Sequence, residues 1–226
     1  SIVALNEHAS ILHYVNYDNQ RPQDHRTFLI DAGARYNGYA ADITRTYAFE
    51  DNEFAALIKD MDTIQLAINQ KIKPGQSYID LHIDFHLSVG QLLNKYDICQ
   101  MSPEAMLETG VTAAFFPHGL GHQIGLQVHD VGGHQANIEG DTAPPPAEHP
   151  FLRNTRPIEA GQILTIEPGL YFIDSLLDNI KASDQNSEMN WSKIESFKPY
   201  GGIRIEDDIL VTTTGHRNLT REFLPD

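Results

Sequence analysis

The chain has 226 residues, of which 41% are hydrophobic and 21% charged, values that are ordinary for a globular protein with a sizeable core. Its formal net charge of −15 argues against nucleic acid as a partner, because a polyanion would be repelled. The single cysteine, Cys99, excludes an intramolecular disulfide and suits a reducing, cytoplasmic compartment. No apolar run approaches the length of a membrane span, so a membrane partner is not expected.

The chain opens on the strand-like segment SIVALNEHASILHY, without an initiator Met or a leader peptide. We therefore expect a piece of a longer protein, and the missing leader says little about targeting. Strands are predicted at Ile2 to Leu5 and Ile11 to Val15. Two more follow within RTFLIDAGA at 26–34 and GYAADITRTYAF at 38–49.

Helices come next along the chain. Apolar residues at helical spacing from Phe54 to Ile68 predict a first helix, with Asp51 as its N-cap. Ser77 begins a capping-box pattern for a second helix. Ser102, followed by Pro103 at the first helical position, predicts a short third helix.

The middle of the chain, residues 117–150, is rich in Gly, His and Pro and is expected to be a functional loop. Two further strands are predicted, in QILTIEPGLYFI at 162–173 and in GIRIEDDILVT at 202–212. A polar, helical excursion around 175–193 separates them. Antiparallel strands with separate helices, rather than alternating βαβ units, predict an α+β fold.

Asn37-Gly38, between two strand-like runs, is a strong signal for a type I′ hairpin, because both central residues of that turn need positive φ. In this register Asp31 pairs with Thr44, and Asp42 is a diagonal neighbour of Asp31 on one face, about 7–8 Å away at most. A register shift of one residue would send the two carboxylates to opposite faces. On this pattern alone, one aspartate capping a turn and the other exposed remains the alternative.

Two more carboxylates interrupt strands that otherwise look half buried. In ILTIEPG, Glu167 lies opposite Leu164 and Ile166, and in GIRIEDD, Glu206 shares a face with Arg204. A buried, unpaired carboxylate is costly and normally takes up a proton. Arg204 could neutralise only one of the four carboxylates, whereas divalent cations could neutralise all of them.

Histidines accompany these carboxylates in FFPHGLGHQIGLQVHDVGGH, which holds His118, His122, His129 and His134. The glycines between His118 and His122, and the lack of a Glu after His118, exclude the HExxH zinc motif. Any one of these histidines, taken singly, could be a surface residue. Four carboxylates with one imidazole suit Mn²⁺, Mg²⁺, Fe²⁺ or Co²⁺ better than a thiolate-bound zinc, and bridging carboxylates would hold two ions about 3.5–4 Å apart.

The segments IDAGARYNGYAADITRTY, HGLGHQIGLQVHD, TIEPGLYF and GGIRIEDD together resemble the pita-bread metallopeptidases, the family of methionine aminopeptidase, aminopeptidase P and prolidase. The longer segments RPIEAGQILTIEPGLYFIDSLL and MNWSKIESFKPYGGIRIEDD look most like bacterial prolidases (Xaa-Pro dipeptidases) and the related organophosphorus acid anhydrolases. The resemblance implies a pita-bread fold, with a curved antiparallel sheet flanked by helices. It also implies that residues 1–226 are a catalytic domain, truncated on its N-terminal side and lacking the family's N-terminal domain.

Carried over position by position, the resemblance implies two divalent metal ions per subunit, with Mn²⁺ favoured. The implied ligands are Asp31, Asp42, His122, Glu167 and Glu206. Asp42 and Glu206 would bridge both ions, Asp31 would complete one site, and His122 and Glu167 the other.

The resemblance also implies the chemistry. Water between two divalent ions has a lowered pKa, which would provide hydroxide to attack the carbonyl of an Xaa-Pro dipeptide. Glu167 would accept the proton of this water and pass it to the leaving nitrogen. His118 or His129 would donate a hydrogen bond to the oxyanion. Arg153 would bind the proline carboxylate, with His13 and His129 lining the pocket. A surface arginine in a Pro-rich loop is the alternative for Arg153.

Arg204 is grouped with the substrate-binding residues and is expected to orient the metal carboxylates, while Tyr78 and Leu12 add apolar wall. Two alternatives remain. One is an organophosphate triester as the main or a side substrate, and the other is a metal-free pita-bread binding module. The resemblance further implies a homodimer in which a neighbouring subunit's N-terminal domain closes the site, so we expect weak or no peptidase activity from this piece alone.

Overall fold

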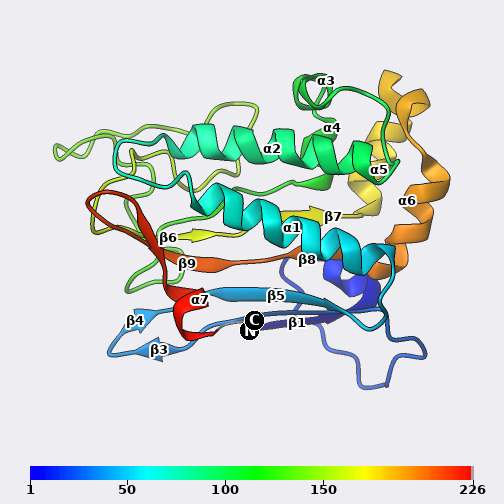
Figure 1. The fold of residues 1–226 in the computed structure, drawn as a ribbon, viewed down its shortest axis with the longest axis horizontal. Coiled ribbons are helices and arrows are strands. Elements are labelled where there is room, and N and C mark those ends of the chain that lie inside the picture. Colours follow the sequence, from blue (N-terminus) through cyan, green and yellow to red (C-terminus); the bar gives the residue numbers. More distant parts are fainter. Residues whose placement is uncertain (225–226) are drawn as a thin grey trace.

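The computed structural model describes residues 1–224, and it contains the separate antiparallel strands and helices of the predicted α+β fold (Figure 1). One sheet has the order β1-β2-β5, built from β1 (Ile2–Leu5), β2 (Thr27–Ala32) and β5 (Ile43–Ala48). A second has the order β10-β9-β6, built from β6 (Ile163–Ile166), β9 (Asp207–Val211) and β10 (His216–Asn218). Two short ribbons pair β3 (Arg35–Tyr36) with β4 (Tyr39–Ala40), and β7 (Gly169–Tyr171) with β8 (Gly202–Arg204).

The first sheet is joined to the link between β8 and β9 by a short antiparallel bridge. Glu206 N donates to Thr44 O at 3.0 Å, and Thr44 N donates to Glu206 O at 3.4 Å. Two residues away, Thr46 Oγ1 donates to the carbonyl oxygen of Arg204 at 2.9 Å. The strands from both halves of the chain therefore lie next to one another at β5, and this seam is where the acidic residues of both halves meet.

Two long helices, α1 (Glu53–Asn69) and α2 (Tyr78–Lys95), run side by side along the same side of the strands (Figure 1). Their inward faces are apolar, with Leu57 and Met61 on α1 and Leu81 and Phe85 on α2 fully buried. These side chains join the main hydrophobic core with strand residues such as Ile166. Burying this apolar stripe is what holds helices of this length against the sheet.

The remaining helices are short. They are α3 (Pro103–Glu108), α4 (Val111–Phe115), α5 (Asp174–Lys181), α6 (Trp191–Phe197) and α7 (Leu219–Phe223), with 3₁₀ turns η1 (Asn6–Ser10), η2 (Asp184–Glu188) and η3 (Lys198–Tyr200). Within residues 1–224 no helix combines the length and the apolar character needed to cross a membrane.

Two of the three predicted helix caps are confirmed. The Ser77 side chain accepts a hydrogen bond from the N–H of residue 80, and the Ser102 side chain accepts one from the N–H of residue 105. The prediction of Asp51 as the cap of α1 is wrong by one residue. Asn52 has the extended backbone of an N-cap, and its side chain accepts hydrogen bonds from the N–H groups of Phe54 and Ala55. The helix therefore begins at Glu53.

Four strand predictions need correction. The strand predicted in GYAADITRTYAF at 38–49 is broken at Ala41-Asp42 into β4 and β5. The strand predicted from Ile11 to Val15 is wrong, because both end residues are exposed and the segment bends after η1 instead of pairing. The segments 162–173 and 202–212, each predicted as one strand, are each broken in two, the first at Glu167-Pro168 and the second at Ile205-Glu206. The helical excursion around 175–193 is confirmed, but it extends from α5 through η2 to α6.

A buried ion cluster lies beside the seam. Asp207, fully buried, forms ion pairs with Arg45 of β5 and Arg221 of α7, both at 2.8 Å. Its carboxylate also accepts hydrogen bonds from Gln65 of α1 and Asn218 of β10. Burial by itself would raise the pKa of Asp207, but these partners outweigh it and hold the pKa below its usual value. One carboxylate thus connects four elements.

We expect Asp207→Ala to destabilise the protein by about 3–5 kcal/mol, because it removes a buried carboxylate that forms ion pairs with Arg45 and Arg221 and accepts hydrogen bonds from Gln65 and Asn218. Urea unfolding at pH 7 measures this change. Asp178→Ala is the matched control, since Asp178 faces Lys181 at 3.7 Å on the surface, and its cost should stay below about 1 kcal/mol. Equal costs for the two variants would contradict the prediction.

Candidate metal centre

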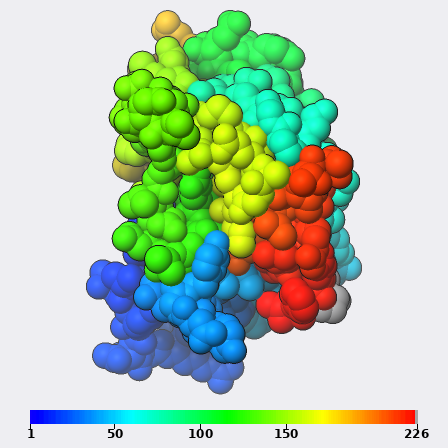
Figure 2. Space-filling view, turned by 90° about the vertical axis from the view of Figure 1, so that its left-hand side faces the viewer, coloured from blue at the N-terminus to red at the C-terminus, as the bar shows by residue number. Residues whose placement is uncertain are grey.

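The β3–β4 hairpin has the predicted register. Asn37 and Gly38 take φ values of 49° and 87°, as a type I′ turn requires, and Tyr36 pairs with Tyr39. Further along the same register, Asp31 pairs with Thr44. The hairpin is anchored to the long loop, because Ala40 N donates to Gly125 O at 2.8 Å, and Figure 2 shows this blue hairpin in contact with the green loop.

The predicted ligands lie at ends and breaks of strands. Asp31 is near the end of β2, Asp42 just before β5, Glu167 directly after β6, and Glu206 between β8 and β9. Strand ends leave backbone groups and side chains free to turn inward, since no ladder continues there. Pro168 has no N–H to donate, so β6 does not continue beyond Ile166 and Glu167 lies just outside it.

The fifth ligand, His122, is held by pairing of its loop with β6. His122 N donates to Thr165 Oγ1 at 3.0 Å, and Thr165 N donates to His122 O at 2.8 Å. The preceding residue must be glycine, because a Cβ on Gly121 would lie 2.1 Å from the Thr165 carbonyl oxygen and 2.4 Å from the Tyr78 hydroxyl. The predicted loop therefore contains a short, tightly packed segment that aims His122 at the carboxylates.

His122 Nε2 lies 3.5 Å from Glu167 Oε1, 3.6 Å from Asp42 Oδ2 and 3.8 Å from Glu206 Oε1. Ligand atoms of Asp42, His122 and Glu206 all lie within 4.8 Å of one another, a spacing that could hold a metal ion. The distances are too long for hydrogen bonds and leave space between the groups. Asp31 faces the same cavity.

The electrostatics of this cluster fit divalent cations. Glu206 is 1% exposed, and burial followed by Glu167 and Asp42 raises its pKa well above the usual value. Burial likewise raises the pKa of Glu167 to about 7 and raises that of Asp31. Thr44 Oγ1 donates to Glu206 Oε2 at 2.7 Å, whereas Glu206 Oε1 is buried and accepts no hydrogen bond from residues 1–224. An oxygen in that state suits a cation.

Arg204 organises one edge of the cluster. Its Nη2 donates to Asp31 Oδ2 at 2.7 Å and its Nη1 donates to the Tyr171 hydroxyl at 3.0 Å. That hydroxyl lies 2.9 Å from His118 Nε2, while His118 Nδ1 lies 2.8 Å from the carbonyl oxygen of Gly119. Burial, then Arg204, lowers the pKa of His118 to about 3, so its ring is neutral at pH 7. A neutral ring that donates from Nδ1 accepts at Nε2.

A cavity of about 610 Å³ opens onto the cluster. All the predicted site residues line it, together with Leu12: Asp31, Asp42, Glu167, Glu206, His122, His118, His129, His13, Arg153 and Arg204. Tyr78 is not part of this lining. It is fully buried behind the wall, and its hydroxyl donates to Thr165 O at 2.9 Å.

The rim of the cavity carries the exposed basic groups. His13, His129 and Arg153 are exposed, and the His129 ring lies 4.4 Å from the His122 ring at an angle of 82°. The backbone at Arg153 is fixed by close packing, because a Cβ on Gly133 would lie 2.2 Å from the Arg153 carbonyl oxygen. The guanidinium therefore extends from a rigid base while remaining open to solvent.

Three residues of the site were missed by sequence reasoning. The hairpin register places Thr44 on the same face as Asp42. This position was a signal that the Thr44 hydroxyl could contact a ligand carboxylate, as it does with Glu206. Asp208 accepts from Asp42 N at 3.2 Å, and burial raises its pKa to about 7. No signal in the sequence indicated Tyr171. The strand is broken at Pro168, so the alternation of side chains along a strand cannot relate the face of Tyr171 to that of Glu167.

A seam of antiparallel strands that gathers four carboxylates and one imidazole at a cavity is the architecture of a metal-dependent hydrolase. The chain belongs to metallopeptidase family M24, whose family model matches residues 1–213. Solved structures confirm the pita-bread fold. Zn-substituted aminopeptidase P of Escherichia coli in complex with product has a TM-score of 0.75 at 30% identity, covering 100% of this chain and 44% of that one. Aminopeptidase PepP of Pseudomonas aeruginosa has a TM-score of 0.75 at 28% identity, with the same shares covered.

Curated relatives are more similar in sequence. The Xaa-Pro dipeptidase of Colwellia psychrerythraea is 51% identical over 223 residues, which is 99% of this chain and 50% of that protein. The Xaa-Pro dipeptidase of Xanthomonas axonopodis pv. citri is 53% identical over 222 residues, covering 98% and 50%. The chain thus spans about half the length of these relatives, and the predicted resemblance to prolidases is confirmed.

We expect Gly121→Ala to destabilise the protein by about 1–3 kcal/mol, because the new methyl group would overlap the backbone of β6. Thermal or urea unfolding of the purified variant measures it. Gly215→Ala is the control, since Gly215 has open space at the Cβ position and should shift the unfolding free energy by less than about 0.5 kcal/mol. A Gly121→Ala variant as stable as this control would show that the loop is free to move away.

A second prediction concerns Glu167 in the presence of a chelator. Because its folded-state pKa is raised to about 7, the folded protein holds a proton there that the unfolded chain releases near pH 4.5. The stability that the folded protein gains from this bound proton is fully present below pH 4.5 and is lost as pH rises through 7. Glu167→Gln should therefore gain stability relative to the unsubstituted protein, on the order of 1–3 kcal/mol, between pH 5 and pH 8.

Urea midpoints of both proteins across this pH range give the difference, which includes the effect of Glu167 on the pKa of Glu206. Adding Mn²⁺ at pH 8 should stabilise the unsubstituted protein and stabilise Glu167→Gln much less. A difference that does not change with pH, or an equal response of both proteins to Mn²⁺, would be inconsistent with an ionised Glu167 that needs a cation.

Proposed function

We propose that this chain hydrolyses Xaa-Pro dipeptides with two divalent metal ions, Mn²⁺ being favoured. The observation that carries the proposal is the buried cluster of four carboxylates and one imidazole, in which Glu206 Oε1 is left without a hydrogen bond in the described chain. Curated relatives at about half identity that carry the name Xaa-Pro dipeptidase support the substrate class. The residues that would hold the ions are Asp31, Asp42, His122, Glu167 and Glu206.

Two such ions, when bound, would polarise the scissile carbonyl and lower the pKa of water to near neutrality. The chain's own contribution to proton transfer is Glu167. Burial raises its pKa to about 7 when no cation is bound, and bound cations would lower it, so that Glu167 could take a proton from water at the site. Its Oε1 lies 3.5 Å from His122 Nε2 and its side chain lines the cavity, which places the carboxylate between the cluster and a bound substrate.

His129 is the better candidate to donate a hydrogen bond to the oxyanion. His118 has both ring nitrogens engaged, one with Gly119 O and the other with the Tyr171 hydroxyl. His129 stands over the edge of the cluster, next to His122, on the exposed side of the cavity. We infer that His118 positions Tyr171 and Arg204, and that His129 contacts the substrate.

Arg153 would bind the carboxylate of the C-terminal proline. It is exposed at the rim of the cavity with His13 and His129, where a free carboxylate could reach its guanidinium without entering the acidic cluster. Arg204 is also in the lining, but its guanidinium is bound to Asp31 and Tyr171. Arg204 therefore orients Asp31 and is not free to bind the substrate carboxylate in a bidentate manner.

Replacing Arg153 by Ala should raise KM for Leu-Pro and lower kcat/KM by about 10–100-fold, because a charge-assisted hydrogen bond contributes about 1.5–3 kcal/mol. Steady-state rates on Leu-Pro and on Leu-Pro amide separate this effect from misfolding. The unsubstituted protein should strongly prefer the free carboxylate, and Arg153→Ala should lose that preference. Arg156→Ala, whose guanidinium pairs with Glu159 outside the cavity, should keep it.

The function itself is tested by turnover in Mn²⁺ of Xaa-Pro dipeptides against a fluorophosphate triester and a dipeptide without proline. Preferential cleavage of the Xaa-Pro bond, lost in Glu167→Gln, is the expected result. A protein that hydrolyses the triester far better than any dipeptide would replace the proposed substrate class. Weak activity of this chain alone is the expected result for a catalytic domain without a neighbouring N-terminal domain. A longer protein that contains this sequence, is metal-loaded and binds a dipeptide, but hydrolyses none of the three, would favour a binding module.

A further inference from the structure

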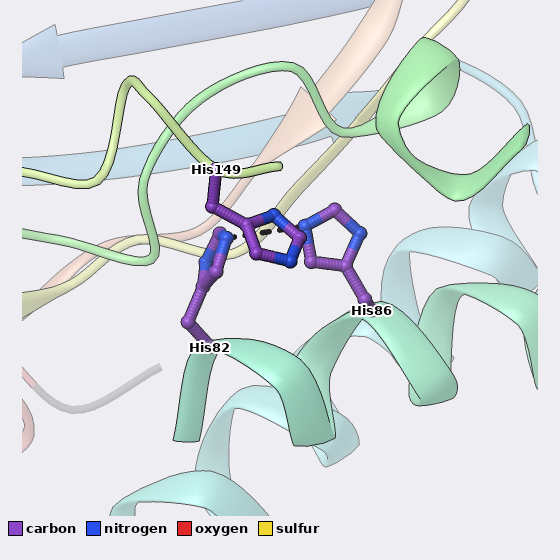
Figure 3. A group of neighbouring side chains, drawn as sticks. All are labelled: His82, His86 and His149. Carbon is purple, nitrogen blue, oxygen red and sulfur yellow. Dashed lines mark hydrogen bonds between the residues drawn. The ribbon is translucent and has the colours of Figure 1, made fainter. Parts of the chain in front are cut away.

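A second group of histidines lies outside the carboxylate cluster. His82 and His86 are one turn apart on α2, and His149 lies on the loop that passes above them. Figure 3 shows the three rings pointing toward one another, and the ring centroids are 4.6 Å, 4.6 Å and 4.7 Å apart in the three pairs. One nitrogen of each ring lies within 4.8 Å of the other two.

We propose that His82, His86 and His149 bind a single transition-metal ion of the zinc class, separately from the carboxylate centre. Three imidazoles with no carboxylate form a ligand set that favours Zn²⁺, Cu²⁺ or Ni²⁺ over the oxygen-preferring Mn²⁺ and Mg²⁺. Three protein ligands would leave a fourth coordination position open.

The spacing of the first two ligands already suits such an ion. The Nε2 atoms of His82 and His86 are 3.2 Å apart. Two nitrogens bound at about 2.0–2.1 Å in a tetrahedral arrangement are roughly 3.3 Å apart, so neither ring has to move far. His149 would complete the site from a half-buried loop, which has more freedom to adjust than the helix.

The surroundings orient the rings for binding. His86 Nδ1 lies 3.0 Å from Thr112 Oγ1 on α4, and a hydrogen bond there directs Nε2 at His82. His82 is 2% exposed, and its Nδ1 has no hydrogen-bond partner in residues 1–224. Phe116 packs against both rings, with centroids at 5.5 Å and 5.1 Å, and shields them from water.

The protonation state also suits a metal. Burial, then the neighbouring histidines, lowers the pKa of His82 to about 2 and that of His86 to about 3, and burial lowers the pKa of His149 as well. The rings are therefore neutral at pH 7, which is the form that binds metals, and binding requires no proton to be displaced to solvent.

A cavity of about 490 Å³ opens onto the three rings. It shares the wall residues Pro117, His118 and Leu152 with the substrate cavity, and His149 and Arg153 lie on the same loop. An ion bound to His149 would tie this end of the loop to α2. The metal site itself, however, rests only on the geometry of the three histidines.

Zinc binding to protein already saturated with Mn²⁺ tests the proposal, with Zn²⁺ counted by elemental analysis and Co²⁺ used as a spectroscopic substitute. We expect one further Zn²⁺ per chain, and intense visible absorption from tetrahedral Co²⁺. His149→Ala should weaken Zn²⁺ binding by at least about 100-fold, because two imidazoles remain where three were. His216→Ala, on β10, is the matched control and should bind as the unsubstituted protein does.

The variant Asp42→Asn/Glu206→Gln separates this site from the carboxylate centre, since it should lose Mn²⁺ and keep the Zn²⁺. Circular dichroism checks that each variant is folded. Unchanged Zn²⁺ affinity in folded His149→Ala, or no additional Zn²⁺ in the unsubstituted protein, would overturn the proposal. Either result leaves the peptidase proposal untouched, since none of these histidines belongs to the carboxylate cluster.

Discussion

Repulsion among buried carboxylates is the constraint on which the rest of this structure depends. Glu206 is 1% exposed, Asp42 is buried, and Asp31 and Glu167 face the same cavity. Like charges repel strongly when they lie this near to one another in a medium of low dielectric constant. Each buried carboxylate also loses its hydration. The chain offers Arg204 to Asp31 and a hydroxyl of Thr44 to Glu206, which is less positive charge than the cluster has negative charge. The divalent cations proposed for this centre would supply the remainder.

Asp207, the neighbour of Glu206, shows what this fold does when a buried carboxylate is structural. Alternation along the strand sends Asp207 to the opposite side, where Arg45 and Arg221 pair with it and its pKa is lowered. At Glu206, one residue earlier, burial and the neighbouring carboxylates outweigh the charge of Arg204, and its pKa is raised. Asp208 turns back toward the cluster and accepts from Asp42 N. Three consecutive acidic residues thus separate into one that is neutralised by the fold and two at the metal centre.

The hairpin, and the meeting of the candidate ligands at one cavity, were predictable because their positions follow from local rules. Positive φ at Asn37-Gly38 sets the register, and the register alone places Asp31 and Asp42 on one face. The breaks at Glu167-Pro168 and before Glu206 were not foreseen, because an apolar alternation continues through both. Asn52 in place of Asp51 as a cap is the usual uncertainty of one residue at a helix end.

Contacts that join distant segments could not be obtained in this way. Tyr171 meets Arg204 and His118 only after β7 and β8 have paired and the loop has folded over them. The same holds for the three histidines. The spacing of His82 and His86 is visible in the sequence as two rings on one helical face, but nothing in the sequence relates them to His149. Local pattern therefore locates the ligands, whereas the groups that orient them emerge from tertiary packing.

The two sites are connected by a short chain of contacts. His86 packs against Phe116, Phe116 against His118, and His118 meets the Tyr171 hydroxyl that Arg204 also contacts. Adjacency of this kind does not by itself make two sites coupled, because coupling needs an element with two arrangements that both sites bias. The loop from His149 to Arg153 forms part of the wall of both cavities. Its backbone at Arg153 is packed tightly against the chain at Gly133, where a Cβ would lie 2.2 Å from the Arg153 carbonyl oxygen, so the structure gives this loop one arrangement. A metal held at His149 and a carboxylate held at Arg153 would then bind as neighbours on one rigid loop, and neither would change the affinity for the other.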